Sequence, residues 1–197
     1  MGLKSKYRFS FTAASLMLSE LINYARILTE NNFSIDSLVP DSLNKEKAKT
    51  SKREFAELKI RLATLSNDEI QLLVYSNLST KKLIAYLACC RAYSYIRDFV
   101  SEVLLDKVSI FDHQITDRDY NAFFSRKCVD HDELEILADT TKAKIKQVVF
   151  KVLEQAGLID NVKARNIIRP IVDARLENIL KTHKPSDLAL LLIPQYA

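Results

Sequence analysis

Hydrophobic residues recur at intervals of three and four positions along most of this chain, which is the pattern of amphipathic helices that pack on a core. The clearest example spans residues 140–156, where the apolar side chains share one face: Ile145, Val148, Val149, Val152, Leu153 and Ala156. The stretch from residue 66 to 108 is strongly apolar, so we expect it to form the centre of the core. Two apolar pairs, Leu158-Ile159 and Ile167-Ile168, flank a polar turn and predict one small β-hairpin.

Side chains that cap helices indicate where the helices begin and end. Ser66 and Glu69 have the spacing of a capping box, Thr116 precedes two acidic residues, and Gly157 stands where a left-handed glycine ends a helix. Helices are therefore expected near residues 12–30, 51–65, 66–75, 79–93, 94–108, 116–127, 130–138, 140–156 and 171–181, with a short turn at 34–39 and a last helix from Ser186.

This pattern predicts an all-α, compact multi-helix protein with at most one small β-hairpin. The two glycines among 197 residues agree, because strands joined by tight turns need more of them. We expect two subdomains that share a core. Residues 1–110 would form an N-terminal helical part with a possible helix-turn-helix, and residues 111–197 a C-terminal part that resembles a winged helix.

The net charge of +4 is small, but its distribution is uneven. Residues 140–170 contain seven Lys and Arg against two acids, a balance of +5. Residues 112–139 contain three basic residues against eight acids, a balance of −5. The C-terminal half is thus polarised, and its basic part coincides with the helix of residues 140–156.

Three helices followed by a hairpin form the order of a winged helix-turn-helix, in which the third helix enters the DNA major groove. Lysines reach phosphate oxygens, and glutamine can also hydrogen-bond a base edge. The candidate DNA-binding residues of this helix are Thr140, Thr141, Lys142, Lys144, Lys146, Gln147 and Lys151, and those of the wing are Lys163, Arg165 and Arg169. The alternative is an ordinary solvated helix face and polar loop.

A second basic segment spans residues 45–61. It leads into the helix expected from residue 51, after the turn at 34–39, which makes a second helix-turn-helix possible. Its candidate DNA-binding residues are Lys49, Lys52 and Arg53. A solvated linker explains the same charges equally well.

Catalysis and metal binding find little support in the sequence. Neither a glycine-rich phosphate loop nor a G-x-S-x-G motif is present. Cys128 and His131 have the spacing of metal ligands but lack the second pair that a structural zinc site needs. Asp117 and Asp119 are better explained as acids in the first turn of a helix. We therefore expect a protein that is not an enzyme, with no catalytic residues, no metal and no cofactor.

The cellular location is suggested by the cysteines and by the length of the apolar runs. Three cysteines, two of them adjacent at Cys89-Cys90, do not form a disulfide framework and indicate the reducing cytoplasm. The longest apolar run, Leu188–Ile193, is far shorter than the roughly 20 residues that span a bilayer. No signal peptide is evident in residues 1–10. We expect no membrane partner and no small-molecule substrate.

Short motifs in a fixed order along nearly the whole chain carry a family resemblance. They are Tyr7–Thr12, Ser15–Glu20, Arg61–Leu65, Cys90–Tyr93 with Ile96 and Phe99, Leu104–Lys107, Tyr120 with Phe123-Phe124, Phe150–Leu153 and Ala156–Leu158. In these the chain resembles the BrxA proteins of bacteriophage-exclusion (BREX) defence systems. Ala13-Ala14 depart from the family pattern, where glycine is expected.

The resemblance implies a small non-enzymatic member of a system that includes a DNA methyltransferase, an ATPase and a phosphatase-like protein. It also implies a helical fold similar to that of the antitermination factor NusB, and DNA binding. The expected partners are double-stranded DNA and other BREX proteins. Two alternatives stay open: an RNA-binding module of NusB type, and a protein-binding scaffold within the defence complex.

Overall fold

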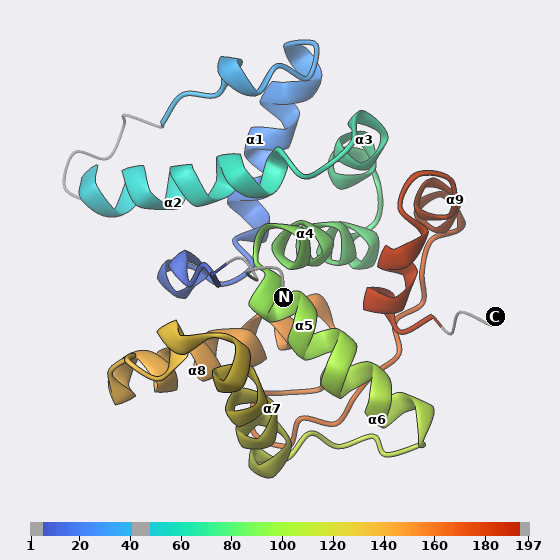
Figure 1. Cartoon of the computed structure of the whole chain (residues 1–197). Coiled ribbons are helices and arrows are strands. Elements are labelled where there is room, and N and C mark those ends of the chain that lie inside the picture. The colour runs from blue at the N-terminus through green and yellow to red at the C-terminus, as the bar shows by residue number, and fades with distance from the viewer. Residues whose placement is uncertain (1–5, 41–47, 194–197) are drawn as a thin grey trace.

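The computed structural model describes residues 6–40 and 48–193, with the side chains of residues 48–51 left out. Over these residues it contains helices and isolated β-bridges but no sheet, which confirms the expected all-α class (Figure 1). The α-helices are α1 Leu18–Glu30, α2 Ala48–Leu62, α3 Asn67–Tyr75, α4 Leu78–Ala92, α5 Ser94–Phe99, α6 Leu105–Ser109, α7 Asp117–Asp130, α8 Asp139–Ala156 and α9 Ala174–His183. The 3-10 turns are η1 Ser10–Ala13, η2 Ile35–Ser37, η5 Asp132–Leu134 and η6 Pro185–Leu191, and the π-helical turn η4 Val100–Leu104 joins α5 to α6.

Helix α4 lies at the centre of the core. Every residue from Leu83 to Cys90 on it is buried, because α2, α3, α5 and α8 pack around it (Figure 1). Burial on all sides explains why this helix is apolar all round instead of having one apolar stripe. The expectation that the middle helices form the core is confirmed. Burial raises the pKa of the thiols of Cys89 and Cys90, so both stay protonated and serve as packing groups.

Several expected helix ends are confirmed by their hydrogen bonds. The Ser66 side chain accepts from the Glu69 amide while the Glu69 carboxylate accepts from the Ser66 amide. Thr116 forms the same kind of box with Asp119. Gly157 adopts φ 83° at the end of α8, a left-handed conformation that glycine takes without steric cost.

The N-terminal segment differs from its prediction. Thr12 does not begin a long helix; it lies in η1, and α1 begins only at Leu18, after Met17 in a left-handed conformation. Between them, residues 14–16 form a short strap held from inside by Arg61, which donates to the carbonyls of Ala14, Ser15 and Leu16. A buried arginine that binds backbone oxygen atoms from another part of the chain has no local sequence signature.

The C-terminal part also departs from the expected winged helix. Where a helix was predicted at residues 130–138, only the 3-10 turn η5 forms, so a helix-turn-helix is not confirmed there. The same holds near residue 35, where η2 is a single turn. Within the described ranges the predicted hairpin is reduced to one bridge, Ile159 to Ile167, and its turn pairs with the segment of residues 113–115 through a bridge from Gln114 to Asn166. The hairpin therefore packs on the body of the protein and does not project as a wing.

One core cluster contains buried residues from both sides of residue 110, and α8 packs directly against α4. The expected boundary at residue 110 stays a prediction. In the part of the chain that the structure describes, none of the helices combines the length and apolar character needed to span a membrane.

Candidate nucleic-acid interface

The outer face of α8 carries most of the side chains expected to contact DNA. Its apolar stripe is buried as predicted, from Ile145 to Ala156. On the opposite face Lys144, Gln147 and Lys151 are exposed. Lys144 Nζ lies 3.2 Å from Gln147 Oε1, and Lys151 Nζ lies 2.5 Å from a carboxylate oxygen of Glu154. The two faces of this helix are therefore assigned correctly from sequence.

These side chains form one wall of a hollow of about 640 Å³. Residues 12–15 of η1 and the strap form the facing wall, and the turn containing Val162 and Arg165 contributes as well. Four cationic residues line it: Lys144, Lys146, Lys151 and Arg165. Among the described residues that line it there is no Asp or Glu. A concave surface lined by cations and by no anions concentrates positive potential, and it therefore attracts anions.

Asp117, in the first turn of α7, fixes two of these cations from outside the hollow. Its Oδ1 lies 2.8 Å from Lys146 Nζ and 2.6 Å from Arg165 Nη1. Hydrogen bonds from Lys146 and then from Arg165 lower the pKa of Asp117 from 3.8 to about 2. The guanidinium of Arg165 also packs on Phe150, with its Cζ 4.3 Å from the ring centroid, and Lys146 Nζ lies 5.2 Å from the centroid of Tyr120.

The prediction that Arg165 stands at the exposed tip of a wing is wrong. Its side chain is only 16% exposed, and its Nε donates to the Val162 carbonyl at 2.9 Å. The residue has φ 55°, so the backbone turns there and brings the side chain back against α7 and α8. Lys163, two residues earlier, is exposed as expected. Of the two tip cations only Lys163 projects into solvent, whereas Arg165 lies in the wall of the hollow.

Replacing Asp117 with Asn should strengthen the binding of any polyanion to this face. The change removes the carboxylate that neutralises Lys146 and Arg165 and leaves a side chain of the same size. We expect up to about a tenfold rise in affinity for duplex DNA at low salt, equivalent to about 1.4 kcal/mol, measured by fluorescence anisotropy. Asp68→Asn on α3 makes the same change of charge at another exposed site and should have little effect. Equal effects of the two variants would show that only net charge matters.

The facing wall of the hollow is anchored on both sides. Arg61 Nη1 lies 2.6 Å from the Ser15 carbonyl oxygen, and Arg61 itself is fully buried. From the other side, Gln155 Oε1 of α8 accepts a hydrogen bond from the Leu16 amide at 2.9 Å. The strap is thus held against α8, and the hollow between them is preformed.

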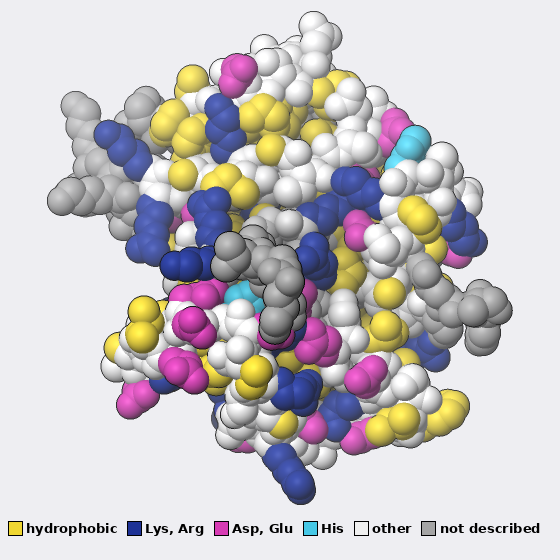
Figure 2. Space-filling view, in the orientation of Figure 1, with side chains coloured by type: hydrophobic (Ala, Val, Ile, Leu, Met, Phe, Trp, Pro, Cys, Tyr) yellow, Lys and Arg dark blue, Asp and Glu magenta, His cyan; other side chains and the backbone are white. Residues whose placement is uncertain are grey.

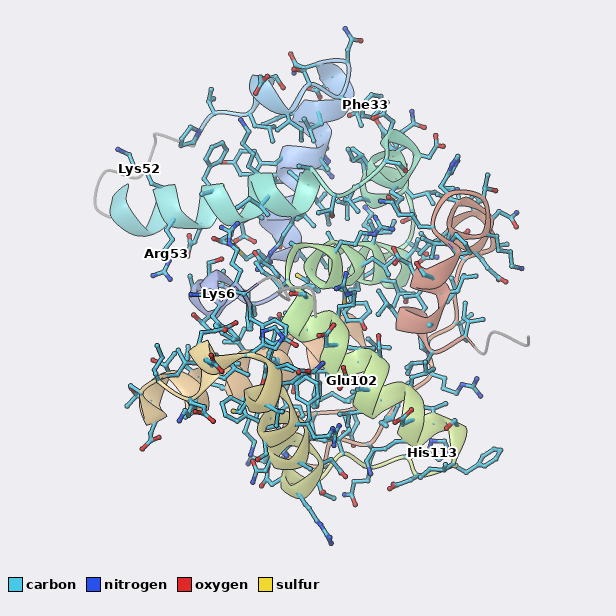
Figure 3. All side chains as sticks on the ribbon, viewed as in Figure 1. Lys6, Phe33, Lys52, Arg53, Glu102 and His113 are labelled. Carbon is cyan, nitrogen blue, oxygen red and sulfur yellow. The ribbon has the colours of Figure 1, made fainter. Side chains whose placement is uncertain are left out.

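The described part of the second predicted basic segment, residues 48–61, lies on α2, on the far side of η1 from α8 (Figure 1). Figure 2 shows Lys and Arg side chains along α2, while Asp and Glu gather below, near the segment that joins α7 to α8. Arg53 points from α2 toward Lys6 near η1, whereas Lys52 points away (Figure 3). The side chain of Lys49 lies outside the described part. Arg61 of the same segment is buried and contributes nothing to a basic surface.

The remaining predicted residues lie at the edges of this face or away from it. Thr140 is exposed in the first turn of α8, and Thr141 is half-buried next to it. Lys142 Nζ lies 6.0 Å from the ring centroid of Phe124, so it extends toward α7 and not into the hollow. Arg169 donates to the carbonyl of Leu192 and therefore lies against the C-terminal turn. The structure thus brings together the α8 cations and Arg165 and leaves Arg169 outside.

Candidate metal ligands are described over residues 6–40 and 48–193. No group of three or more His, Cys, Asp and Glu side chains is placed to hold a metal ion in those ranges. His131 is buried, stacks on Tyr7 with 3.9 Å between ring centroids, and lies 3.1 Å from a carboxylate oxygen of Glu133. Asp119 caps α7 through Thr116, as the sequence suggested.

Sequence reasoning missed several residues of the site, and three of them are polar or charged. Thr12 and Ser15 belong to the facing wall, and Asp117 binds two of the cations. Asp117 was assigned only to the helix dipole. The surplus of acids in residues 112–139 beside the surplus of bases in residues 140–170 was the one available signal for this pairing.

Comparison with known proteins gives a consistent result. A family model described as BrxA matches residues 5–184. A protein of Bacillus cereus (strain H3081.97), described as BREX protein BrxA, is 23% identical over 172 residues, which cover 85% of this chain and 86% of that protein. A protein of Escherichia coli O9:H4 (strain HS) with the same description is 24% identical over 143 residues, 73% of this chain and 67% of that protein.

A solved structure shares the fold. The crystal structure of an uncharacterized protein from Magnetospirillum magneticum matches with a TM-score of 0.74 at 16% identity, covering 95% of this chain and 97% of that chain. At this identity the likeness concerns the fold alone.

Proposed function

Because the chain belongs to the BrxA family, we propose that it is a component of a bacteriophage-exclusion (BREX) defence system that binds double-stranded DNA and catalyses no reaction itself. The relatives described as BREX protein BrxA support the place in the system. The observation that supports DNA as the ligand is the cationic face of α8, where Lys144, Lys146, Lys151 and Arg165 line one concave surface. For a protein with these proposed ligands and partners we infer a location in the bacterial cytoplasm.

The arrangement of charges favours contact with the DNA backbone over base-specific recognition. Lysine is a flexible point charge that approaches phosphate oxygens from many directions, and it carries little sequence information. Gln147 is an exposed side chain of this face whose amide can both donate to and accept from a base edge. We therefore expect affinity to depend strongly on salt and weakly on DNA sequence.

The predicted winged-helix geometry is not needed for this function. The turn at residues 160–166 packs on residues 113–115, so α8, η1 and Lys163 form a surface without a projecting wing. Arg53 points from α2 toward Lys6 near η1 (Figure 3), and η1 packs against both α2 and α8. A duplex that spans η1 would contact both predicted basic segments.

Salt dependence of duplex binding tests the proposal. If about five phosphates are contacted, log affinity should fall with log salt at a slope of roughly −4 to −5. The measurement is fluorescence anisotropy with two unrelated duplexes of equal length, which should give nearly equal slopes and affinities. A slope near zero, or no duplex binding at low salt, would instead favour the protein-binding scaffold. Tighter binding of structured RNA in competition would favour the RNA-binding alternative.

A further inference from the structure

The hollow beside α8 is too small for a DNA duplex, yet its lining is suited to a nucleotide. Its volume of about 640 Å³ lies within the range of roughly 300–1,000 Å³ typical of small-ligand sites. A B-form duplex contacts a protein with its backbone and grooves, and only an unstacked nucleotide can enter a hollow of this size. A duplex can contact the cations at the rim of the hollow, whereas its interior has room for a single nucleotide.

The charge of the hollow fits a phosphate group. Asp117 neutralises part of the charge of Lys146 and Arg165, and Glu154 pairs with Lys151. Lys144, by contrast, donates a hydrogen bond to the neutral side chain of Gln147. Four cations against two anions leave an excess of two positive charges at the hollow. That excess matches the charge of a phosphate monoester and exceeds that of one diester phosphate.

The uncharged part of the lining fits a base and a sugar. Ala13, Ala14, Ala143 and Val148 provide small apolar surfaces beside the cations. The guanidinium of Arg165 lies over Phe150 and also lines the hollow, and a base can stack on such a plane. The remaining polar groups are hydroxyl and amide groups that can bind base edges or ribose: Thr12, Ser15 and Gln147.

The walls are held in place before any ligand binds. Arg61 and Gln155 fix the strap at Ser15 and Leu16, while Asp117 fixes the guanidinium of Arg165 on the other side. A preformed site avoids the entropic cost of ordering its walls on binding.

From this size, charge and lining we propose that the hollow binds a single nucleotide unit, with its phosphate at Lys144 and Lys151 and its base against Arg165 and Ala143. This unit could be a free nucleotide, or a nucleotide unstacked from DNA. The second source rests on the DNA binding proposed above. Unstacking costs least at a mismatch or bulge, so DNA with such a defect would be favoured over a fully paired duplex.

Isothermal titration calorimetry of the full chain separates the two sources. Deoxynucleoside monophosphates should bind with a Kd below about 1 mM, and the matching nucleoside and inorganic phosphate about tenfold more weakly, if the ligand is a free nucleotide. If the ligand is part of DNA, a duplex with a one-nucleotide bulge should bind about tenfold tighter than its fully paired counterpart, whether or not free nucleotides bind.

A variant that fills the hollow without changing its charge links either result to this site. Ala143 is exposed on α8 and lines the hollow, so Ala143→Trp should abolish nucleotide binding or the preference for the bulge. Ala122→Trp on an exposed position of α7 is the matched control and should bind as the wild type does. If nucleotides fail to bind and bulged and paired duplexes bind equally, the proposal is overturned while duplex binding stands. The proposal is also overturned if Ala143→Trp binds nucleotides, or prefers the bulged duplex, as strongly as the wild type does.

Discussion

Replacing Arg61 with leucine should lower the free energy of unfolding by about 3–5 kcal/mol, a large share of the roughly 5–15 kcal/mol that stabilises a domain of this kind. Arg61 is fully buried, and its guanidinium donates to the carbonyls of Ala14, Ser15 and Leu16 and to the hydroxyl of Tyr93. Leucine would leave these acceptors without a donor in the core. Urea denaturation followed by circular dichroism measures the change.

The buried carboxylate of Glu57 adds to this cost. Glu57 is 3% exposed and accepts from the Tyr93 hydroxyl at 2.5 Å and from Arg8 and Ser10 at 3.0 Å. Tyr93 thus connects the buried anion to the buried Arg61. Loss of Arg61 removes a buried cation near Glu57 and leaves the carboxylate with its ion pair to Arg8, whose side chain is 48% exposed. A buried charge without compensation is what makes removal of one partner costly.

Two further variants separate this role from simple loss of a charge or of volume. Arg61→Lys keeps the cation but cannot reach three carbonyls at once with the same geometry, so we expect an intermediate loss of stability. Arg97→Leu removes an arginine whose side chain is 51% exposed and should change stability by about 0.5 kcal/mol or less. If Arg61→Leu were no more costly than Arg97→Leu, the strap would have to be held by other contacts.

The contrast between Arg61 and Ser66 shows which features the sequence can predict. The capping box of Ser66 and Glu69 is local, because both residues bind the backbone of one helix turn, and the sequence predicted it correctly. The buried stripe of α8 was predicted for the same reason, since its period follows from helix geometry. Arg61 instead binds backbone more than 40 residues away, so its burial leaves no mark on the neighbouring sequence.

The candidate site was predicted only as far as α8 itself. The sequence placed Lys144, Gln147 and Lys151 correctly, because they lie on the face of the helix opposite its apolar stripe. The prediction of a projecting wing was wrong, because hydrogen bonds to residues 113–115 hold the turn against the body of the protein. Such pairing depends on the tertiary fold. The hollow could not be predicted at all, since its two walls come from residues 12–15 and from α8, far apart in the chain.

Reversing the charge of two lysines on α8 should have the largest effect on DNA binding. Lys144→Glu with Lys151→Glu removes two attractive contacts and adds two repulsive ones to the face that carries the proposed function. We expect affinity for duplex DNA to fall by at least about 100-fold at low salt, about tenfold for each reversed residue, and the salt slope to become shallower by about two units. Both lysines are exposed, so stability should change by about 1 kcal/mol or less.

The matched control carries the same total change of charge on another helix. Arg175→Glu with Lys181→Glu alters two exposed cations of α9, each of which has an ion pair with a near neighbour in sequence, just as Lys151 has with Glu154. Anisotropy titrations at several salt concentrations should then give a wild-type slope for the α9 variant and a shallower one for the α8 variant. Equal losses in both would mean that DNA responds to overall charge, and the assignment of α8 as the binding face would be wrong. A loss confined to the α9 variant would show that DNA binds at α9. The cations of α8 would then serve only to pair with Asp117 and Glu154.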